Sequence, residues 1–234
     1  MNRADDDPAA KFALKNVRKM ADAGMAVVMA DIEAARLQTA VDSLTAAGHR
    51  AIGVPTDVSS EAQIKALAEA ALDTYGAVHV VCNNAGIGIG GAVDEMSLDY
   101  WRWTIDVDLW SVVYGVRTFL PLLKAQGEGH ITATSSMAGL VSGPVLGAYH
   151  VAKHGVVALM DTVRIELKRM PGLIEMTVRD EALQQELILR LGLALIGMLR
   201  PIDSEAAQIA QAGVDRALAL VGRGVERDLQ RDDE

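Results

Sequence analysis

Short apolar runs that suit buried strands alternate with longer segments of helical period along most of this chain of 234 residues. This alternation is typical of a parallel sheet covered by helices. We therefore expect an α/β fold with a three-layer, doubly wound parallel sheet. The expected strands are Met25–Ala30, Ala51–Val54, Val78–Cys82, His130–Thr134 and Ile174–Val178. The expected helices are Ala9–Ala23, Glu33–Ala47, Ser60–Tyr75, Leu98–Lys124, Ala148–Arg169, Asp180–Leu199 and Ser204–Val221.

Glycines mark the ends of the first three expected helices. Gly24, Gly48 and Gly76 each follow a helical segment, where a left-handed residue ends a helix. No linker and no low-complexity stretch interrupts the pattern, so residues 1–234 are expected to form a single domain. The segment Met1–Lys11 contains no apolar run, so the strand that opens such a fold is expected to be missing or replaced.

Composition excludes several classes of protein. A net charge of −9 argues against binding to nucleic acid, because contacts to phosphate need clustered Lys and Arg. The single Cys82 favours a reducing compartment. Asp5, Asp6 and Asp7 stand where a signal peptide carries cations, and Leu191–Leu199 is too short to cross a bilayer. We expect a soluble cytoplasmic protein with no membrane partner.

The pair Tyr149 and Lys153 is the strongest local signal for chemistry. Side chains four residues apart share one face of a helix, and a nearby cation favours the phenolate form that a general base needs. By itself this spacing also occurs by chance on structural helices.

Polar groups also follow the other expected strands, where open parallel sheets bind ligands. Asp31, Asp57 and the run Asn83-Asn84-Ala85-Gly86 stand at three strand ends, and Ser135 and Ser136 follow a fourth. With the Tyr-x-x-x-Lys element thirteen residues after Ser136, this pattern resembles the short-chain dehydrogenase/reductase family, which has a Rossmann-like fold. The resemblance extends from Ala21 to Lys168.

The resemblance implies hydride transfer between nicotinamide and an alcohol or ketone. Tyr149 matches the general acid/base of the family, Lys153 the lysine that promotes ionisation of the tyrosine and holds the nicotinamide ribose, and Ser136 the serine that hydrogen-bonds the substrate oxygen. Ser135 is expected to bond backbone at the strand end. No metal ligand is expected.

The resemblance also implies cofactor contacts. Asn83, Ala85 and Gly86 match the stretch that passes the adenosine side of the cofactor and steadies the sheet. Asp31 matches the carboxylate that accepts ribose hydroxyls and selects NAD over NADP, and its alternative is a cap for the next helix. Asp57 and Val58 match the pair beside the adenine ring, and Asp57 has the same capping alternative.

Four features depart from the family pattern. No glycine precedes Gly24, so the glycine-rich phosphate loop is lacking. Asp108 stands where the family has asparagine, and its charge should stabilise Lys153 as a cation and oppose a phenolate at Tyr149. The family Pro-Gly after the sixth strand is replaced by residues 179–181. A G-x-G-x-x-G pattern at Gly86, Gly88 and Gly91 is interpreted as a loop near the substrate, because no helix follows promptly.

His150 and His154 lie four residues apart, but the sequence places no third ligand, so a solvated or interface role is predicted for them. The segment Leu187–Leu199 fits either the variable lid of the family or an ordinary buried helix. We expect an NAD-dependent oxidoreductase that forms a dimer or tetramer. The alternative is a non-catalytic relative that serves as an oligomeric binding partner.

Overall fold

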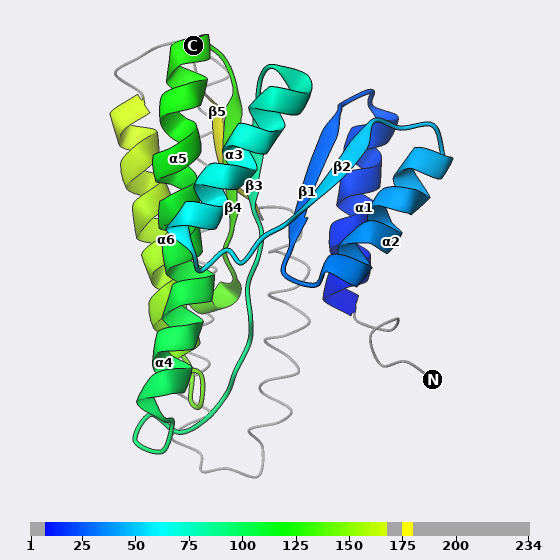
Figure 1. Ribbon diagram of the computed structural model, residues 1–234. Helices are drawn as coiled ribbons and strands as arrows, with labels where there is room; N and C mark the ends of the chain where they lie inside the picture. The colour runs from blue at the N-terminus through cyan, green and yellow to red at the C-terminus, as the bar shows by residue number, and fades with distance from the viewer. Residues whose placement is uncertain (1–7, 168–174, 180–234) are drawn as a thin grey trace, which may run out of the picture.

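The computed structural model describes residues 8–167 and 175–179 of the chain, in which helices and parallel strands alternate (Figure 1). The helices are α1 (Pro8–Asp22), α2 (Ala34–Ala46), α3 (Glu61–Tyr75), α4 (Leu98–Ile105), α5 (Ser111–Gln126) and α6 (Gly147–Leu167). The strands are β1 (Val27–Asp31), β2 (Ala51–Pro55), β3 (Val80–Asn83), β4 (His130–Thr134) and β5 (Glu175–Arg179). The two helices expected beyond residue 180 lie outside the described residues.

The strands form two parallel sheets. β1 pairs with β2, with Val27 opposite Ala51, while β3, β4 and β5 form a separate sheet in that order. Among the described residues, no strand lies between β1 and β3. The architecture is Rossmann-like, but the sheet is divided where the sequence lacks an opening strand.

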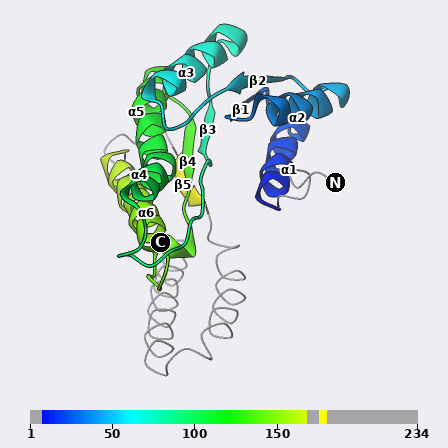
Figure 2. The ribbon, with the colours of Figure 1, turned by 60° about the horizontal axis from the view of Figure 1, so that its bottom comes forward.

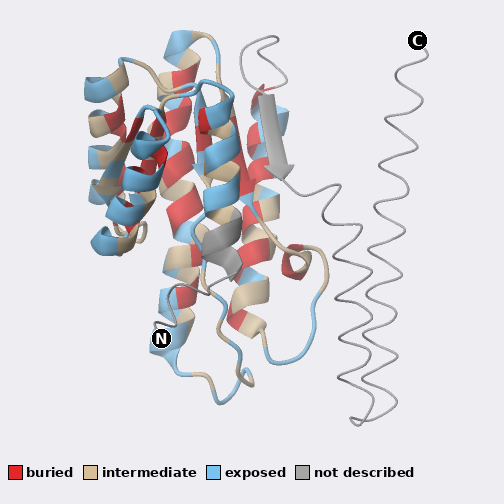
Figure 3. Ribbon diagram, turned by 90° about the vertical axis from the view of Figure 1, so that its right-hand side faces the viewer, coloured by how far each residue is buried: buried red, intermediate tan, exposed pale blue. Residues whose placement is uncertain are grey.

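Each sheet has its own hydrophobic cluster. The smaller cluster joins Val27 and Met29 of β1 to Leu37 and Leu44 of α2. The larger cluster lies between β3–β4 and the helices α3, α5 and α6; its wholly buried members include Leu123, Ile131 and Met160. Figure 2 shows α3, α5 and α6 beside β3–β5 and α1 and α2 beside β1–β2, and Figure 3 shows buried residues where helices meet strands.

Several local predictions are confirmed. Each described strand overlaps its expected range, and Gly24, Gly48 and Gly76 have φ angles of 88°, 84° and 77°. The long helix expected over Leu98–Lys124 is interrupted, however. Between α4 and α5 the chain forms a π-helical segment, Asp106–Trp110, whose central residue Asp108 is completely buried. Such segments are frequent at functional sites.

Candidate active site

The N-terminal half of α6 carries Tyr149 and Lys153 one turn apart. The Nζ atom of Lys153 lies 5.5 Å from the centre of the Tyr149 ring, and Lys153 is only 3% exposed while Tyr149 is half-buried. A buried ammonium group needs partners, because removing a charge from water is costly. One partner is the carbonyl oxygen of Thr134 at the end of β4, at 3.3 Å.

The second partner of Lys153 is Asp108. Its Oδ1 lies 3.1 Å from Nζ, and both side chains are almost wholly buried. Oδ1 also accepts a hydrogen bond from the N–H of Ile87, at 3.1 Å, whereas the buried Oδ2 has no hydrogen-bond partner. Burial raises the pKa of the Asp108 carboxyl group above its usual value, while Lys153 and the N–H of Ile87 act in the opposite direction. The sequence predicted that the charge of Asp108 stabilises Lys153 as a cation, and in the structure the two side chains form a direct ion pair.

Gly86 leaves the space that this ion pair occupies. A Cβ atom added at Gly86 would lie 2.6 Å from Oδ1 of Asp108 and 3.2 Å from Nζ of Lys153. Gly86 is exposed on its other side. Gly86, at the end of the Asn-Asn-Ala-Gly run, thus packs closely against the ion pair. The ion pair connects the π-helical segment to α6, and Gly86 adds the loop after β3 to this contact.

The two serines after β4 differ in their bonds. The Oγ atom of Ser136 accepts the N–H of Ala138 at 3.2 Å and begins the short 3-10 turn Met137–Gly139. This bond uses a lone pair and leaves the hydroxyl proton of Ser136 available to a ligand. Ser135 donates its hydroxyl proton to the carbonyl oxygen of Lys153, at 3.1 Å, as the backbone role predicted for it requires.

The Asn83-Asn84 pair fastens the loop after β3 to β4. Nδ2 of Asn83 donates to the carbonyl oxygen of Thr132 at 3.1 Å, and Oδ1 of Asn84 accepts from the hydroxyl of Thr134 at 2.9 Å. Asn83 also approaches α5 so closely that a Cβ atom at Gly115 would overlap its Oδ1. Ala85, like Gly86, is exposed.

Asp31, Asp57 and Val58 form a second group near the ends of β1 and β2. Oδ1 of Asp31 accepts the N–H of Glu33, the residue before α2, at 2.8 Å. Asp57 accepts the N–H and the hydroxyl of Ser59, while the neighbouring Ser60 caps α3. Both acids therefore stabilise the turns before α2 and α3, but neither is the N-cap of its helix: Glu33 precedes α2 with no side-chain cap, and Ser60 caps α3. The side chain of Val58 packs against the larger hydrophobic cluster.

The residues present fit part of a nicotinamide dinucleotide. Lys153 has three N–H donors, of which Asp108 and Thr134 engage two, so one can reach a ribose hydroxyl. Asp31 is half-buried at the carboxyl end of β1, where a second ribose can meet its carboxylate. For the pyrophosphate, the described residues show no glycine-rich loop before α1, which begins at Pro8.

The loop interpretation of the G-x-G-x-x-G pattern is confirmed. Residues 84–90 are irregular and the next helix, α4, begins only at Leu98. The N–H of Gly91 donates to the carbonyl oxygen of Val145 at 2.7 Å, so this loop meets the loop that leads into α6. Val145 has a φ angle of 60°, a strained conformation for a β-branched residue and one that no sequence pattern announced.

Sequence reasoning missed the role of His150. A solvated or interface position was predicted for it, but both of its ring nitrogens lie within hydrogen-bond distance of backbone atoms, Nδ1 at the carbonyl oxygen of Ala138 and Nε2 at the N–H of Gly143. The signal that could have found it is its place directly after Tyr149. In the described part of the chain no cluster of His, Cys, Asp and Glu forms a metal site.

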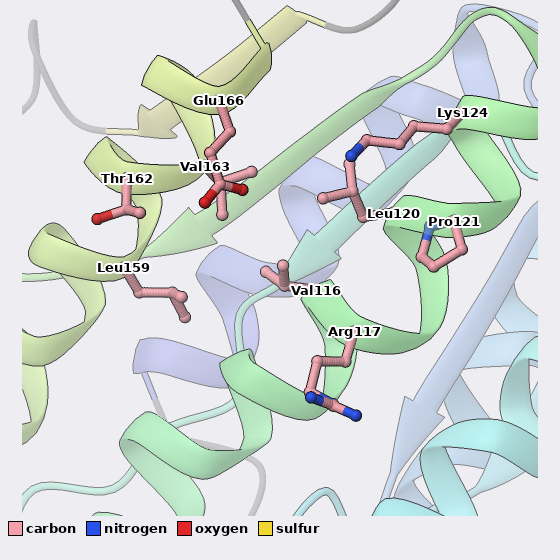
Figure 4. A pocket seen from close by; sticks show the side chains of 9 residues that line it. All are labelled: Val116, Arg117, Leu120, Pro121, Lys124, Leu159, Thr162, Val163 and Glu166. Carbon is pink, nitrogen blue, oxygen red and sulfur yellow. The ribbon is translucent and has the colours of Figure 1, made fainter.

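A groove of about 490 Å³ lies between α5 and α6 (Figure 4). Its lining includes Leu120 and Lys124 of α5 and Leu159 and Glu166 of α6. On α6 it begins six residues beyond Lys153, about 9 Å along the helix axis, so it is separate from the candidate active site. No described helix is long and apolar enough to span a bilayer.

Comparison with known proteins identifies the family in which this fold and this arrangement of side chains occur. The model of the short chain dehydrogenase family matches residues 10–181, so the chain belongs to that family. Cyclohexanol dehydrogenase from Acinetobacter sp. (strain SE19) is 36% identical over 148 residues, which are 63% of this chain and 59% of that protein. The 1-deoxy-11-beta-hydroxypentalenate dehydrogenase of Streptomyces exfoliatus is 34% identical over 153 residues, 64% of this chain and 56% of that protein. The chain thus spans less than two thirds of the length of these relatives.

Solved structures agree with the fold. A short chain dehydrogenase/reductase from Burkholderia phymatum, in complex with NAD, matches with a TM-score of 0.68 at 44% identity, over 69% of this chain and 58% of that one. A metagenomic short-chain oxidoreductase in complex with NADP matches with a TM-score of 0.65 at 30% identity, over 69% and 72% of the two chains. The Rossmann-like fold inferred from the alternation of strands and helices is therefore confirmed.

Proposed function

We propose that this chain is an oxidoreductase that transfers a hydride between NAD and an alcohol or ketone. The observation that carries the proposal is the buried Lys153 beside the ring of Tyr149 on α6 and bonded to Thr134 at the end of β4, two residues before Ser136. Two similar proteins named as dehydrogenases support an alcohol or ketone as the substrate class. The non-catalytic alternative gains no support from a chain that retains Ser136, Tyr149 and Lys153.

The proposed chemistry assigns one role to each side chain. In the oxidation direction, the hydroxyl proton of the alcohol moves to the phenolate oxygen of Tyr149, and a bound nicotinamide ring supplies the acceptor for the hydride that leaves the carbinol carbon. Ser136 donates its hydroxyl proton in a hydrogen bond to the substrate oxygen while charge develops there. The ammonium group of Lys153 favours the phenolate, and the carboxylate of Asp108 offsets part of that effect.

The preference for NAD over NADP rests on Asp31. A carboxylate that accepts ribose hydroxyls repels the 2′-phosphate of NADP. Similar structures hold NAD in one case and NADP in another, so the preference depends on the residues of this chain. Asp57, Val58, Asn83, Ala85 and Gly86 are proposed to complete the cofactor site on the adenosine side, beside Tyr149 and Lys153 at the nicotinamide end.

We also propose a homo-oligomer, either a dimer or a tetramer, formed through the outer faces of α5 and α6. The apolar residues Val116, Val156 and Met160 of these two helices are buried within the larger cluster of the subunit and do not take part in this contact. The groove of Figure 4 lies on this face and offers other residues, among them Arg117 and Glu166. The single Cys82 supports a reducing, cytoplasmic location for the assembly.

Replacement of the proposed general acid/base tests the function. Tyr149→Phe keeps the ring and removes the phenolic oxygen, so it should lower turnover of a secondary alcohol or ketone at least ~100-fold. Tyr75→Phe is the matched control, because Tyr75 ends α3, where Arg50 lies over its ring. Steady-state kinetics with NAD or NADH give the comparison, and a Tyr149→Phe variant with unchanged activity refutes the assignment.

A further inference from the structure

His150 follows Tyr149 on α6 and lies against the segment that leads from β4 to α6. Its Nδ1 atom is 3.0 Å from the carbonyl oxygen of Ala138, and its Nε2 atom is 2.9 Å from the backbone nitrogen of Gly143. The N–H of Gly143 can only donate, so Nε2 must accept and carries no proton. Nδ1 therefore holds the proton of a neutral imidazole and donates it to Ala138.

Ala138 connects His150 to the candidate catalytic serine. The carbonyl oxygen of Ala138 accepts from His150, and its N–H donates to Oγ of Ser136 at 3.2 Å. The next residue, Gly139, is buried so tightly that an added Cβ atom would lie 2.5 Å from Oγ of Ser135 and 2.6 Å from the carbonyl oxygen of Lys153. Ala138 is thus bonded at both its N–H and its carbonyl oxygen, and the packing at Gly139 leaves the 3-10 turn no room to shift toward α6.

His150 also holds the later part of the same segment. The N–H of Gly143 donates to the His150 ring, and the backbone N–H of His150 donates to the carbonyl oxygen of Leu146 at 2.8 Å, next to the strained Val145. His154, one turn later on α6, differs in that its Nδ1 lies 2.9 Å from the carbonyl oxygen of His150 in the same helix. Of these two imidazoles, His150 is the one whose hydrogen bonds leave the helix.

We propose that His150 is a positioning residue for Ser136: in its Nδ1-protonated form it binds the carbonyl oxygen of Ala138 and so fixes the backbone of that residue, whose N–H orients Oγ of Ser136 toward the substrate oxygen. This proposal rests on the proposed function, because it assumes that Ser136 hydrogen-bonds the substrate. The fixed N–H of Ala138 occupies a lone pair of Oγ, so the hydroxyl proton is directed away from the backbone. His150 then affects the rate without touching substrate or cofactor.

The tautomer is measurable without any activity. Nitrogen-15 NMR of the labelled chain, with His150→Gln to assign its signals, should show the imidazole proton of His150 on Nδ1. In His150→Phe the amide protons of Ala138 and Gly143 should exchange with solvent at least ~10-fold faster, and in His154→Phe they should exchange as in the parent chain. A proton on Nε2, or unchanged exchange in His150→Phe, overturns the proposal even if the chain proves to be an active dehydrogenase.

A double-mutant cycle with Ser136→Ala tests the connection to the serine. His150→Phe should lower kcat ~10-fold or more with little change in KM. His150→Gln keeps one donor and one acceptor, so it should lower kcat by a smaller factor. In the Ser136→Ala background His150→Phe should cause no further loss, because its effect passes through the serine. Equal losses in both backgrounds overturn the proposal. A chain without turnover contradicts the proposed function and leaves the NMR result to decide the position of His150.

Discussion

Asp108 places a carboxyl group in the protein interior, beside the ammonium group of Lys153. Two effects act on it in opposite directions, because burial favours the neutral acid while the ion pair and the N–H of Ile87 favour the carboxylate. Burial is the larger effect, so the pKa of Asp108 is raised in the folded chain. An acid whose pKa is higher in the folded chain than in the unfolded chain stabilises the folded state at pH values below its pKa in the unfolded chain. This stabilisation is lost as the pH rises through the pKa that the group has in the folded chain.

The substitution Asp108→Asn tests the direction in which Asp108 changes stability with pH. Asparagine has nearly the same shape and does not titrate, so the free energy of unfolding of the parent chain minus that of the variant should decrease as the pH rises from about 4 to about 8. Urea denaturation at each pH gives both values. Asp99→Asn is the control, because Asp99 is 93% exposed and pairs with Arg102 on the surface. A difference that grows with pH shows that Lys153, and not burial, dominates.

The space above the ion pair gives a second test at the residue scale. The methyl group added in Gly86→Ala meets Oδ1 of Asp108 at 2.6 Å, so the pair must separate or the loop must move. We expect a loss of about 1–3 kcal/mol in the free energy of unfolding, typical of overpacking. Gly88→Ala is the matched control two residues later, where nothing lies within 4 Å of the added atom. Equal effects of the two substitutions, measured by urea denaturation, contradict this account.

At the scale of the elements, the sequence located the helices and strands but not their interruptions. Apolar period and terminal glycines predicted α2, α3 and β4 within a residue or two, because these signals are local. The π-helical segment Asp106–Trp110 has no such signal, since the helical period of the apolar residues continues through it. Its effect on the site is large, because it carries the buried Asp108. The contacts of His150 were likewise unpredictable, because they depend on where the loop before α6 passes.

The contact between α5 and β3 supports a prediction with an unusual sign. Replacing a glycine inside a helix with alanine normally stabilises a protein by about 0.5–1 kcal/mol. Gly115→Ala should instead destabilise this chain, because the added methyl group overlaps the side-chain amide of Asn83. In a cycle with Asn83→Ala, which removes that amide, the coupling energy should reach about 1 kcal/mol or more by urea denaturation. A stabilising Gly115→Ala argues against the close approach.

At the scale of the whole molecule, the division of the sheet was predicted only in part. The lack of an apolar run in Met1–Lys11 predicted a missing or replaced strand, and the described strands form two separate sheets with separate hydrophobic clusters. The proposed cofactor residues fall on both sides, with Asp31 and Asp57 near β1–β2 and Lys153 near β4. The hydrogen bonds of Asp31 and Lys153 remain on their own sides, whereas the N–H of Asp57 donates to Gln63 of α3, which packs on the larger cluster.

This arrangement predicts weak binding of NADH to the chain of 234 residues. Hydrogen bonds to a charged group contribute roughly 1.5–3 kcal/mol each, so lacking two at the pyrophosphate costs about 3–6 kcal/mol. We expect a dissociation constant on the order of hundreds of micromolar or weaker. Replacing Met1–Lys11 with an apolar strand and a Thr-Gly-x-x-x-Gly-x-Gly loop should tighten binding. Calorimetry that shows low-micromolar affinity for the unmodified chain contradicts the prediction.

The facing edges of β1 and β3 also govern how the molecule behaves in concentrated solution. Strand edges that no described strand covers are templates for pairing between copies, and such pairing begins when two molecules approach closely. A net charge of −9 keeps copies apart through repulsion over a Debye length of about 10 Å at 0.1 M salt. Added salt shortens that length, so we expect the colloidal stability of this chain to fall as the ionic strength rises.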